Sequence, residues 1–563
     1  MNPAESPPRS SLAISKNPFA LAFASAIAFW LAFPPADRGF LGWFALAPFF
    51  SLVRCDQKPW KVYLASWFGG MIFGVLSVSW VACVDVIGML LLAFYMSLWW
   101  PLFLLPARLG VRRLGLPLML VAPVVWVGLE YLRSLLVSGF PWYYLAHSQH
   151  AYLPMIQVCD LFGAWGLSFL MAMVNVLGAE LGPRFRREVG ITTWTRTQVI
   201  ETSVIVALVL ASLAYGAIRL STSKFRPGPR VALLQTDISQ GLKNAGLDLA
   251  QILAKIDALV IRAAESTPRP DLLVWPETSY PPGFVKIDPK LSAAEFARLA
   301  KIDYPDWTPN DWRSRQRHAS VELHGLTDSI RIPMVIGLAS YDFGQSEFLK
   351  YNSAVLMAPG KAEISRYNKR ALVPVGEYFP FLEVMPWLLW LTPYTDGYVP
   401  TLSPGQSAEI LESQGVRYAP IICFEDTIPW ISREAANASN KSGRADVLLN
   451  LTNDGWFMGS AEQPTHLAIS VFRAVECRLP LARAVNTGIS ALIDGNGRIR
   501  QSLRAGQEGV LIVEIPLDGR FSFYRWFGDS FAILCLTLTV VLFPACAYHS
   551  RQTAPLAQGA SVG

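Results

Sequence analysis

Three chemically reactive side chains each lie at or near the end of a hydrophobic run in the central part of the chain. Glu277 follows the run LVWP, Lys369 lies within YNKRALVPVGEY, and Cys423 follows the run PII. A cysteine thiol needs a base to remove its proton, and the oxyanion formed in acyl transfer needs a positive group nearby. The residue types therefore predict a nucleophilic site with Glu277 as base, Lys369 as the positive group and Cys423 as nucleophile.

Each of these residues also has a simpler interpretation. A carboxylate after a strand is more often solvated or caps a helix, a lysine in a basic run is normally exposed, and a cysteine at a strand end usually belongs to the core. The presence of all three in one domain, in the order Glu, Lys, Cys, favours the chemical interpretation.

Three neighbouring residues are expected to support this chemistry. The backbone N–H of Phe424 is a candidate second donor to the oxyanion. Glu377 and Glu425 are expected to flank the site, where they would position Lys369 and shape the electric field around Cys423. A purely structural role for either carboxylate stays open.

Short β-type runs separated by helical stretches surround these residues and predict an α/β layered domain. Helices are expected over 245–265 and 464–478, and the polar residues 283–325 are interpreted as an insertion outside the core. The predicted strands are Val231–Gln235, Leu272–Trp275, Met334–Leu338, Ser353–Met357, Tyr418–Cys423, Val447–Leu451, Ser490–Ile493 and Val510–Ile515.

Composition places the rest of the chain in a membrane. Of 563 residues 52% are hydrophobic and only 16% are charged, whereas about a quarter is usual for soluble proteins. A bilayer needs about 20 apolar residues per helix. Strong candidate spans are 17–36, 62–84, 86–107, 161–179, 202–218 and 530–548, and weaker ones are 39–53 and 114–136.

These eight spans divide the chain into three parts. Residues 1–220 would form seven transmembrane helices, 221–526 the catalytic domain, and 527–563 an eighth transmembrane helix with a cytoplasmic tail. The first span is read as an anchor, since it is long and lacks a small-residue cleavage site. Within 114–136, Glu130 and Arg133 lie three residues apart and are expected to form a structural ion pair, although an intramembrane charge can also mark function.

Basic residues predict the orientation of the spans. With both termini in the cytoplasm, the loops on that side hold most of the arginines and lysines of the membrane part, and the catalytic domain is periplasmic. The cytoplasmic basic residues would be Arg54, Lys58, Lys61, Arg108, Arg112, Arg113, Arg184, Arg186, Arg187 and Arg196.

An apolar segment lies between Lys369 and Cys423. It runs MPWLLWLTPY over residues 385–394, and it predicts either a core helix or, since prolines bracket it, a lid that dips into the bilayer surface. The lid residues would be Trp387, Leu388, Leu389, Trp390 and Tyr394. Neither a nucleic-acid motif nor paired metal-ligand spacing is found in the sequence, so no nucleic-acid partner, metal or other cofactor is expected.

The order of the three reactive motifs resembles the nitrilase superfamily, whose members use Glu, Lys and Cys in acyl transfer. With the apolar spans around it, the chain resembles the apolipoprotein N-acyltransferase family over almost its whole length. Further matching motifs are GFPW at 139–142, NDGWF at 453–457, RAVE at 473–476 and RAVNTG at 483–488. The resemblance implies an eight-helix membrane domain joined to a nitrilase-like α-β-β-α sandwich in the bacterial inner membrane.

The resemblance also implies the substrates. A membrane phospholipid would donate the acyl group, and the diacylglyceryl-cysteine at the N-terminus of an apolipoprotein would accept it in a ping-pong reaction through a Cys423 thioester. Two positions depart from the family pattern: Phe424 replaces a common tyrosine and Asn244 a common tryptophan. These departures put substrate preference in question rather than the reacting groups.

Two other classes of protein remain as alternatives. A membrane-anchored amidase or nitrilase would share the three reactive residues, but a soluble substrate requires neither the spans nor the apolar segment. A transporter would be expected to line several spans with polar residues, whereas only Glu130 and Arg133 stand out.

Overall fold

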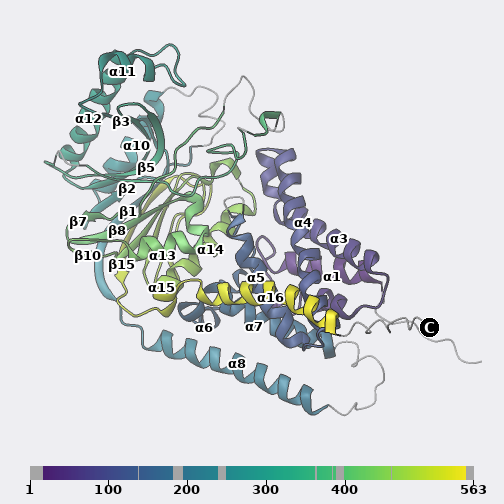
Figure 1. The fold of residues 1–563 in the computed structure, drawn as a ribbon. Helices are drawn as coiled ribbons and strands as arrows, with labels where there is room; N and C mark the ends of the chain where they lie inside the picture. Colours follow the sequence, from purple (N-terminus) through teal and green to yellow (C-terminus); the bar gives the residue numbers. More distant parts are fainter. Residues whose placement is uncertain are drawn as a thin grey trace, which may run out of the picture.

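The computed structural model describes residues 17–136, 139–181, 195–238, 249–361, 364–382, 384–387, 399–457 and 459–552. A bundle of apolar helices lies at one side of the molecule, and a two-sheet domain lies at the other (Figure 1). The long helix α8 runs along the outside of the bundle and leads into the first strand of the sheets.

Helical segments cover each of the predicted spans. Four helices within the described residues are long and apolar enough to cross a membrane, namely Val86–Arg113, Cys159–Leu181, Arg196–Ser221 and Ser530–His549. The count of eight spans stays a prediction, because the other segments are shorter or less apolar. The principal helices are α1 (Pro18–Leu31), α3 (Pro59–Ser77), α4 (Val86–Arg108), α5 (Leu118–Arg133), α7 (Cys159–Leu181), α8 (Arg196–Ser221) and α16 (Ser530–Gln552).

The span expected over 39–53 is not one continuous helix. It consists of 3-10 turns at Gly39–Trp43 and Ser51–Arg54 around the short helix α2 (Ala47–Phe50). Asn175 of α7 satisfies backbone groups freed by the break, since its Nδ2 donates to the Gly42 carbonyl at 2.9 Å and its Oδ1 accepts from Leu46 N at 2.7 Å. Buried side-chain partners of this kind allow irregular backbone inside a bundle.

Glu130 and Arg133 are both buried in α5, but they contact other groups rather than each other. Glu130 accepts hydrogen bonds from Trp126 Nε1 and Leu145 N, and Arg133 donates to the Trp142 carbonyl. The expected ion pair is therefore replaced by bonds to the loop that follows the helix.

Two sheets form the half of the molecule that lies beside the helix bundle. The first has the order β15-β1-β2-β4-β5-β6, with β3 paired to β4, and the second has the order β14-β13-β12-β11-β8-β7. The first contains β1 (Arg226–Gln235), β2 (Leu272–Val274), β3 (Tyr280–Ile287), β4 (Met334–Phe343), β5 (Phe348–Met357), β6 (Ser365–Asn368) and β15 (Gly509–Leu517). The second contains β7 (Leu411–Ser413), β8 (Val416–Ile422), β11 (Val447–Thr452), β12 (Leu481–Val485), β13 (Ala491–Ile493) and β14 (Ile499–Ser502). A separate two-residue pair joins β9 (Ser439–Asn440) and β10 (Gly443–Arg444).

Helices cover the outer face of each sheet. Helices α10 (Leu249–Ala264) and α12 (Pro309–Ile330) pack on the first sheet, and α13 (Pro429–Asn437) and α14 (Glu462–Cys477) pack on the second. A third set of buried side chains fills the space between the sheets. The layers follow the order α-β-β-α, and all eight predicted strands coincide with observed ones.

The interpretation of residues 283–325 as an insertion is wrong at both ends of the range, because residues 283–287 belong to strand β3 of the first sheet and residues 309–325 belong to helix α12. Helix α12 contributes Ala319 and Leu323 to the core under the first sheet, so it is one of the layer helices. The remainder, including α11 (Ala293–Leu299), packs with Trp312 into a small core of its own. Its polar sequence misled the prediction because α12 buries only one narrow face.

The helix bundle and the sandwich share a buried interface. Helix α14 packs against α7, and the two belong to one continuous hydrophobic cluster. Arg478, at the end of α14, lies 2.7 Å from Asp160 of α7, and both side chains are almost fully buried. Ala164 N of α7 also donates to the Glu476 carboxylate. The interface is therefore apolar with internal ion pairs, which resembles a domain interior more than a flexible contact.

Candidate active site

Glu277 lies just beyond β2, at the carboxyl end of that strand. The chain stays close to β4 here, because Trp275 N donates to the Val335 carbonyl and Ser279 N donates to the Gly337 carbonyl. Gly337 makes this approach possible, since a Cβ at that position would lie 2.2 Å from the Pro276 carbonyl oxygen. The Glu277 side chain is buried, with 8% of its surface exposed.

Lys369 follows β6 and points into the same buried space. Its backbone N–H donates to the Asn352 carbonyl, and its own carbonyl accepts from Gly405 N. The Nζ atom lies 3.4 Å from Glu277 Oε1 and 2.9 Å from Glu377 Oε1. The ammonium therefore bridges two carboxylates.

Cys423 comes from the other sheet, at the point where β8 turns into a 3-10 turn over Cys423–Thr427. Its φ of +52° lies in the left-handed region, which costs a residue with a Cβ roughly 1–2 kcal/mol. This conformation is stored strain of the kind found at reactive turns. Cys423 lies close enough to Glu277 and Lys369 for both charges to act on its thiol, so the structure brings all three predicted reacting residues together.

The resting thiol is protonated. Burial and the nearby Glu277 carboxylate raise the pKa of the Cys423 thiol to about 12, while Lys369 opposes this effect. Burial also raises the pKa of Glu277, against the stabilising effect of Lys369 on its charged form. Because Cys423 does not ionise near neutral pH by itself, the geometry requires a base that takes its proton as it reacts.

The positive charge on Lys369 is secured by its neighbours. Burial disfavours the ammonium, but the carboxylates of Glu377 and Glu277 hold the Lys369 pKa above its ordinary value. The side chain is only 1% exposed. A fixed charge in such a dry setting stabilises developing negative charge far better than one in water.

Asn352 of β5 is a site residue that the sequence prediction missed. Its Nδ2 donates to Glu277 Oε1 at 2.6 Å and to Glu377 Oε1 at 3.1 Å. The predicted strand began one residue later, at Ser353. An asparagine directly before a hydrophobic strand gives little signal, because asparagine is also common in turns.

Glu377 and Glu425 hold the segment that carries Lys369. Glu377 Oε2 accepts from Val373 N at 2.8 Å, which closes the loop that follows the lysine. Glu425 accepts from Arg370 N at 2.6 Å, Ala371 N at 3.0 Å, Ile422 N at 2.7 Å and the Tyr367 hydroxyl. Its carboxylate thus ties the loop after Lys369 to the strand that ends at Cys423.

A buried charged network lies on the other side of Cys423. His466 Nε2 is 2.6 Å from Asp426, and its Nδ1 is 3.1 Å from Asp454 and 3.3 Å from Glu462. The Arg483 guanidinium contacts both aspartates at 2.9 Å. Among the described residues, Asp454, Glu462 and His466 have metal-ligand spacing. Because Arg483 already places a positive charge against Asp454 and His466 Nδ1, we interpret the group as an ion-pair network.

Apolar residues connect the site to the helix bundle. Phe424 and Phe457 pack against the large cluster that contains buried Trp80 and Trp142 of the bundle. Trp387 is 57% exposed, and it is the one predicted lid residue that the structure describes. Leu388, Leu389, Trp390, Tyr394 and the departure at Asn244 lie outside the described residues.

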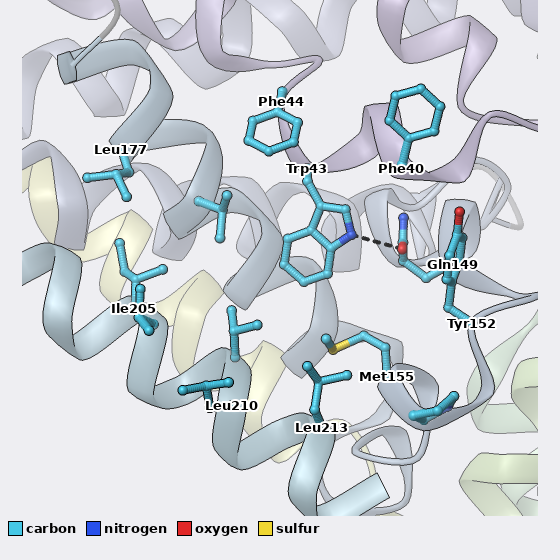
Figure 2. Close-up of a pocket in the computed structure, with 14 residues that line it drawn as sticks. Phe40, Trp43, Phe44, Gln149, Tyr152, Met155, Leu177, Ile205, Leu210 and Leu213 are labelled. Atoms are coloured by element: carbon cyan, nitrogen blue, oxygen red, sulfur yellow. Dashed lines mark hydrogen bonds between the residues drawn. The ribbon is translucent and has the colours of Figure 1, made fainter. Parts of the chain in front are cut away.

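A cavity of about 470 Å³ lies outside the candidate active site, between α8 and the rest of the helix bundle. Figure 2 shows it surrounded by Trp43, Met155, Leu210 and Leu213, with the Gln149 amide at one side. That amide is already engaged, since it accepts from Trp43 Nε1 and donates to the Gly39 carbonyl and the Ser148 hydroxyl. The cavity offers none of the three reacting groups and is not the reaction site.

Comparison with known proteins defines the class first. Residues 230–522 match the family described as carbon-nitrogen hydrolase, which agrees with the two-sheet sandwich. A solved mutant of the amidase from Nesterenkonia sp. AN1, in which acetamide is added to the active-site cysteine, is 20% identical, with a TM-score of 0.36 over 56% of this chain and 98% of that chain. The family model covers more than half of the chain, so the two-sheet half is a carbon-nitrogen hydrolase domain.

Comparisons of the N-terminal helical part and of the whole chain identify the family within this class. Residues 25–177 match the apolipoprotein N-acyltransferase N-terminal domain. The apolipoprotein N-acyltransferase of Geobacter metallireducens is 33% identical over 94% of this chain and 95% of that protein. The one from Chlorobaculum tepidum is 28% identical over 95% and 97%. The chain belongs to the apolipoprotein N-acyltransferase family and is an acyltransferase.

Proposed function

We propose that this enzyme transfers a fatty acyl group from a membrane phospholipid to the α-amino group of an N-terminal diacylglyceryl-cysteine on an apolipoprotein. Cys423 carries the acyl group between the two substrates as a thioester. The observation that supports this most strongly is the convergence of Glu277, Lys369 and Cys423 from separate strands into one buried site.

The first half-reaction forms the acyl-enzyme. Glu277 takes the Cys423 proton while the sulfur attacks the ester carbonyl of the phospholipid, and the oxyanion is stabilised by Lys369 and the Phe424 N–H. The ester C–O bond then breaks, and Glu277 returns the proton to the leaving alkoxide. A lysophospholipid and a Cys423 thioester result.

The second half-reaction consumes the thioester. The lipoprotein amine attacks the thioester carbonyl, Glu277 accepts a proton from the nitrogen, and the C–S bond breaks. An amide is released, and the proton returns to the Cys423 sulfur. Because the first product leaves before the second substrate reacts, the kinetics are ping-pong.

Apolar surface near the site supports a substrate held in the bilayer. Phe424 and Phe457 pack against a hydrophobic cluster that continues into the helix bundle, so apolar surface connects the neighbourhood of Cys423 with the membrane part of the chain. Trp387, in the predicted lid segment 385–394, is 57% exposed, and Phe381 and Val384, just before that segment, are 58% and 80% exposed. Exposed apolar side chains grouped in this way typically meet a membrane or a partner.

Contacts at the two ends of the bundle support the orientation. Arg54, Arg108 and Arg112, predicted to be cytoplasmic, gather at one end, where Arg108 donates to the Leu52 carbonyl and Arg112 pairs with Asp56. The connections predicted to be outer contact the sandwich instead: Trp80 packs on Phe457, Trp142 on His466, and Gln157 donates to the Asn496 carbonyl. We therefore propose a multi-pass inner-membrane enzyme with eight spans, a periplasmic catalytic domain and cytoplasmic termini.

A reconstituted transfer assay tests the proposed substrates. Purified enzyme is mixed with phosphatidylethanolamine vesicles and a synthetic diacylglyceryl-cysteine peptide, and both products are measured by mass spectrometry. We expect N-acyl peptide and lysophospholipid in equal amounts, with parallel lines in double-reciprocal plots. Free fatty acid in place of N-acyl peptide would instead indicate a hydrolase.

A further inference from the structure

His466 is a buried titratable residue that the proposed reaction does not use. It is about 1% exposed and lies at the centre of the charged network behind Cys423. The side chains that face it come from four elements: Asp426 from the nucleophile turn, Asp454 from the turn after β11, Glu462 from its own helix α14, and Arg483 from β12.

Two chains of contacts connect His466 to the nucleophile. In the first, His466 Nε2 lies 2.6 Å from Asp426, which belongs to the same 3-10 turn as Cys423. The Ser470 hydroxyl, one helical turn along α14, donates to the other Asp426 oxygen at 2.6 Å. The turn is thus attached to α14 through Asp426, three residues after Cys423.

The second connection reaches the Cys423 backbone itself. Arg483 contacts His466 Nδ1 at 2.9 Å and donates to Asn450 Oδ1 at 3.2 Å. Asn450 Nδ2 in turn donates to the Cys423 carbonyl at 3.4 Å. The network therefore holds the nucleophile from both ends of its turn.

This support matters because the Cys423 backbone is strained. A non-glycine residue with φ of +52° keeps that conformation only where surrounding contacts impose it. Relaxation of the turn would move the sulfur away from Glu277. A misplacement of about 1 Å can reduce a rate roughly 100-fold.

The membrane half of the chain completes the support. The Trp142 ring, from the loop after α5, packs on the His466 ring with 5.6 Å between centroids. Phe140 stacks on Trp142. The Trp80 ring centroid lies 5.2 Å from that of Trp142 and 4.7 Å from that of Phe457, and Phe457 belongs to the turn that begins at Asp454. A column of aromatic rings from the bundle therefore covers the charged network.

We propose that His466 is a positioning residue for the nucleophile turn and that Trp142 holds it in place, so that the membrane domain fixes the geometry of Cys423. This rests on the proposed role of Cys423 and assigns a catalytic consequence to the contact between the two halves. The nitrilase-type domain would then depend on the bundle for an aligned thiol as well as for access to lipid.

The test uses full-length protein in detergent and two rates measured on Cys423. The first is single-turnover acylation by phospholipid, and the second is alkylation by iodoacetamide as a function of pH, both followed on the Cys423 peptide by mass spectrometry. The His466→Gln variant should lower both rates by roughly 10- to 100-fold, with unchanged KM for phospholipid. His147→Gln is the matched control, because His147 is equally buried and packs on Phe472 of α14 without touching the network.

Two variants of Trp142 test whether its ring holds His466 in place. Trp142→Phe keeps a ring on His466 and should retain both rates, whereas Trp142→Leu should lower them in the same way as His466→Gln. If His466→Gln does not fold, Ser470→Ala is the deciding variant. It removes a neutral hydroxyl that donates to Asp426 and accepts from Arg483, and it should produce a smaller decrease in both rates.

The outcomes separate this proposal from the proposed function. Wild-type alkylation rate and pH profile in folded His466→Gln, or in Ser470→Ala if His466→Gln does not fold, would overturn the positioning role. Wild-type rates in Trp142→Leu would overturn the role of the membrane loop. If Cys423 of the wild-type protein is alkylated by iodoacetamide but never acylated by phospholipid, the proposed function is wrong. The positioning role of His466 would then be judged from the alkylation rates alone.

Discussion

The Glu425 carboxylate accepts a hydrogen bond from the backbone N–H of Arg370 at 2.6 Å, although the two residues follow strands of different sheets. Glu425 lies two residues after Cys423, and Arg370 lies one residue after Lys369. One buried carboxylate therefore sets the separation between the loop that carries the ammonium and the turn that carries the thiol.

Replacement of Glu425 by Gln should disconnect these two segments. In the variant, the glutamine NH₂ group would replace one of the two carboxylate oxygens that accept hydrogen bonds from backbone N–H groups. Each buried N–H donor left without an acceptor costs about 1–3 kcal/mol. We expect kcat to fall roughly tenfold or more, because small displacements of reacting groups have large effects on rate. Steady-state kinetics check this, with Glu434→Gln as control. Glu434 pairs with the Arg370 side chain at the surface, so its loss should leave kcat unchanged.

Removal of the Lys369 charge should slow formation of the thioester. Loss of one oxyanion donor typically lowers kcat about 10²- to 10³-fold, and Lys369→Met also leaves Glu277 and Glu377 without their shared counter-charge. Single-turnover acylation of Cys423 measures the effect. Lys350→Met is the control, since Lys350 pairs with Asp303 and not with the site. Equal acylation rates in the two variants would refute the role of Lys369.

The pH dependence should respond to Asn352. Burial raises the pKa of Glu277, and the hydrogen bond from Asn352 opposes this rise. In Asn352→Leu the Glu277 pKa should therefore increase. Since Glu277 acts as a base only when deprotonated, the acidic limb of kcat/KM should move to higher pH. Ser353→Ala, at the neighbouring position and bonded to Asn368 instead, should keep the wild-type profile. A shift in the opposite direction would exclude Glu277 as the group that titrates.

The interface between the two halves should depend on Asp160. Its carboxylate accepts from Arg478, Arg219 and the Tyr215 hydroxyl, and it is almost fully buried. Breaking a buried ion pair by neutralising one partner costs about 3–5 kcal/mol, so Asp160→Asn should lower the melting temperature in detergent. Glu295→Gln removes a surface pair with Arg298 and should leave it unchanged. If the two variants melt at the same temperature, the interface does not depend on this carboxylate.

The sequence was sufficient for much of the fold, because hydrophobic runs mark buried strands and long apolar stretches mark spanning helices. The strands before Glu277 and Cys423 were recognisable in this way. The break over 39–53 was not, because it depends on Asn175, more than a hundred residues away. Helix α12 was misjudged because one narrow buried face carries little hydrophobic signal.

The candidate site was predictable only as a set of residue types in order. Glu277, Lys369 and Cys423 lie at or near the ends of recognisable segments. Their side-chain chemistry suggested their roles, and the family resemblance supplied the acyl donor and acceptor. Asn352 and His466 were missed, and Arg483 was noted only as part of the motif RAVNTG, because the importance of all three comes from contacts between elements distant in sequence. The left-handed backbone conformation of Cys423 could not be predicted from the sequence either, because the contacts that impose it come from other elements.

Mass spectrometry of the purified enzyme after incubation with phospholipid vesicles tests the central claim most directly. We predict a fatty-acyl adduct on the Cys423 peptide that neutral hydroxylamine removes, as it removes a thioester. In Cys423→Ser no hydroxylamine-sensitive adduct should appear, and Cys477 should stay unmodified because it is buried and its thiol faces the Ser432 carbonyl. An unmodified Cys423 in active enzyme, or the same labile adduct in Cys423→Ser, would contradict the account.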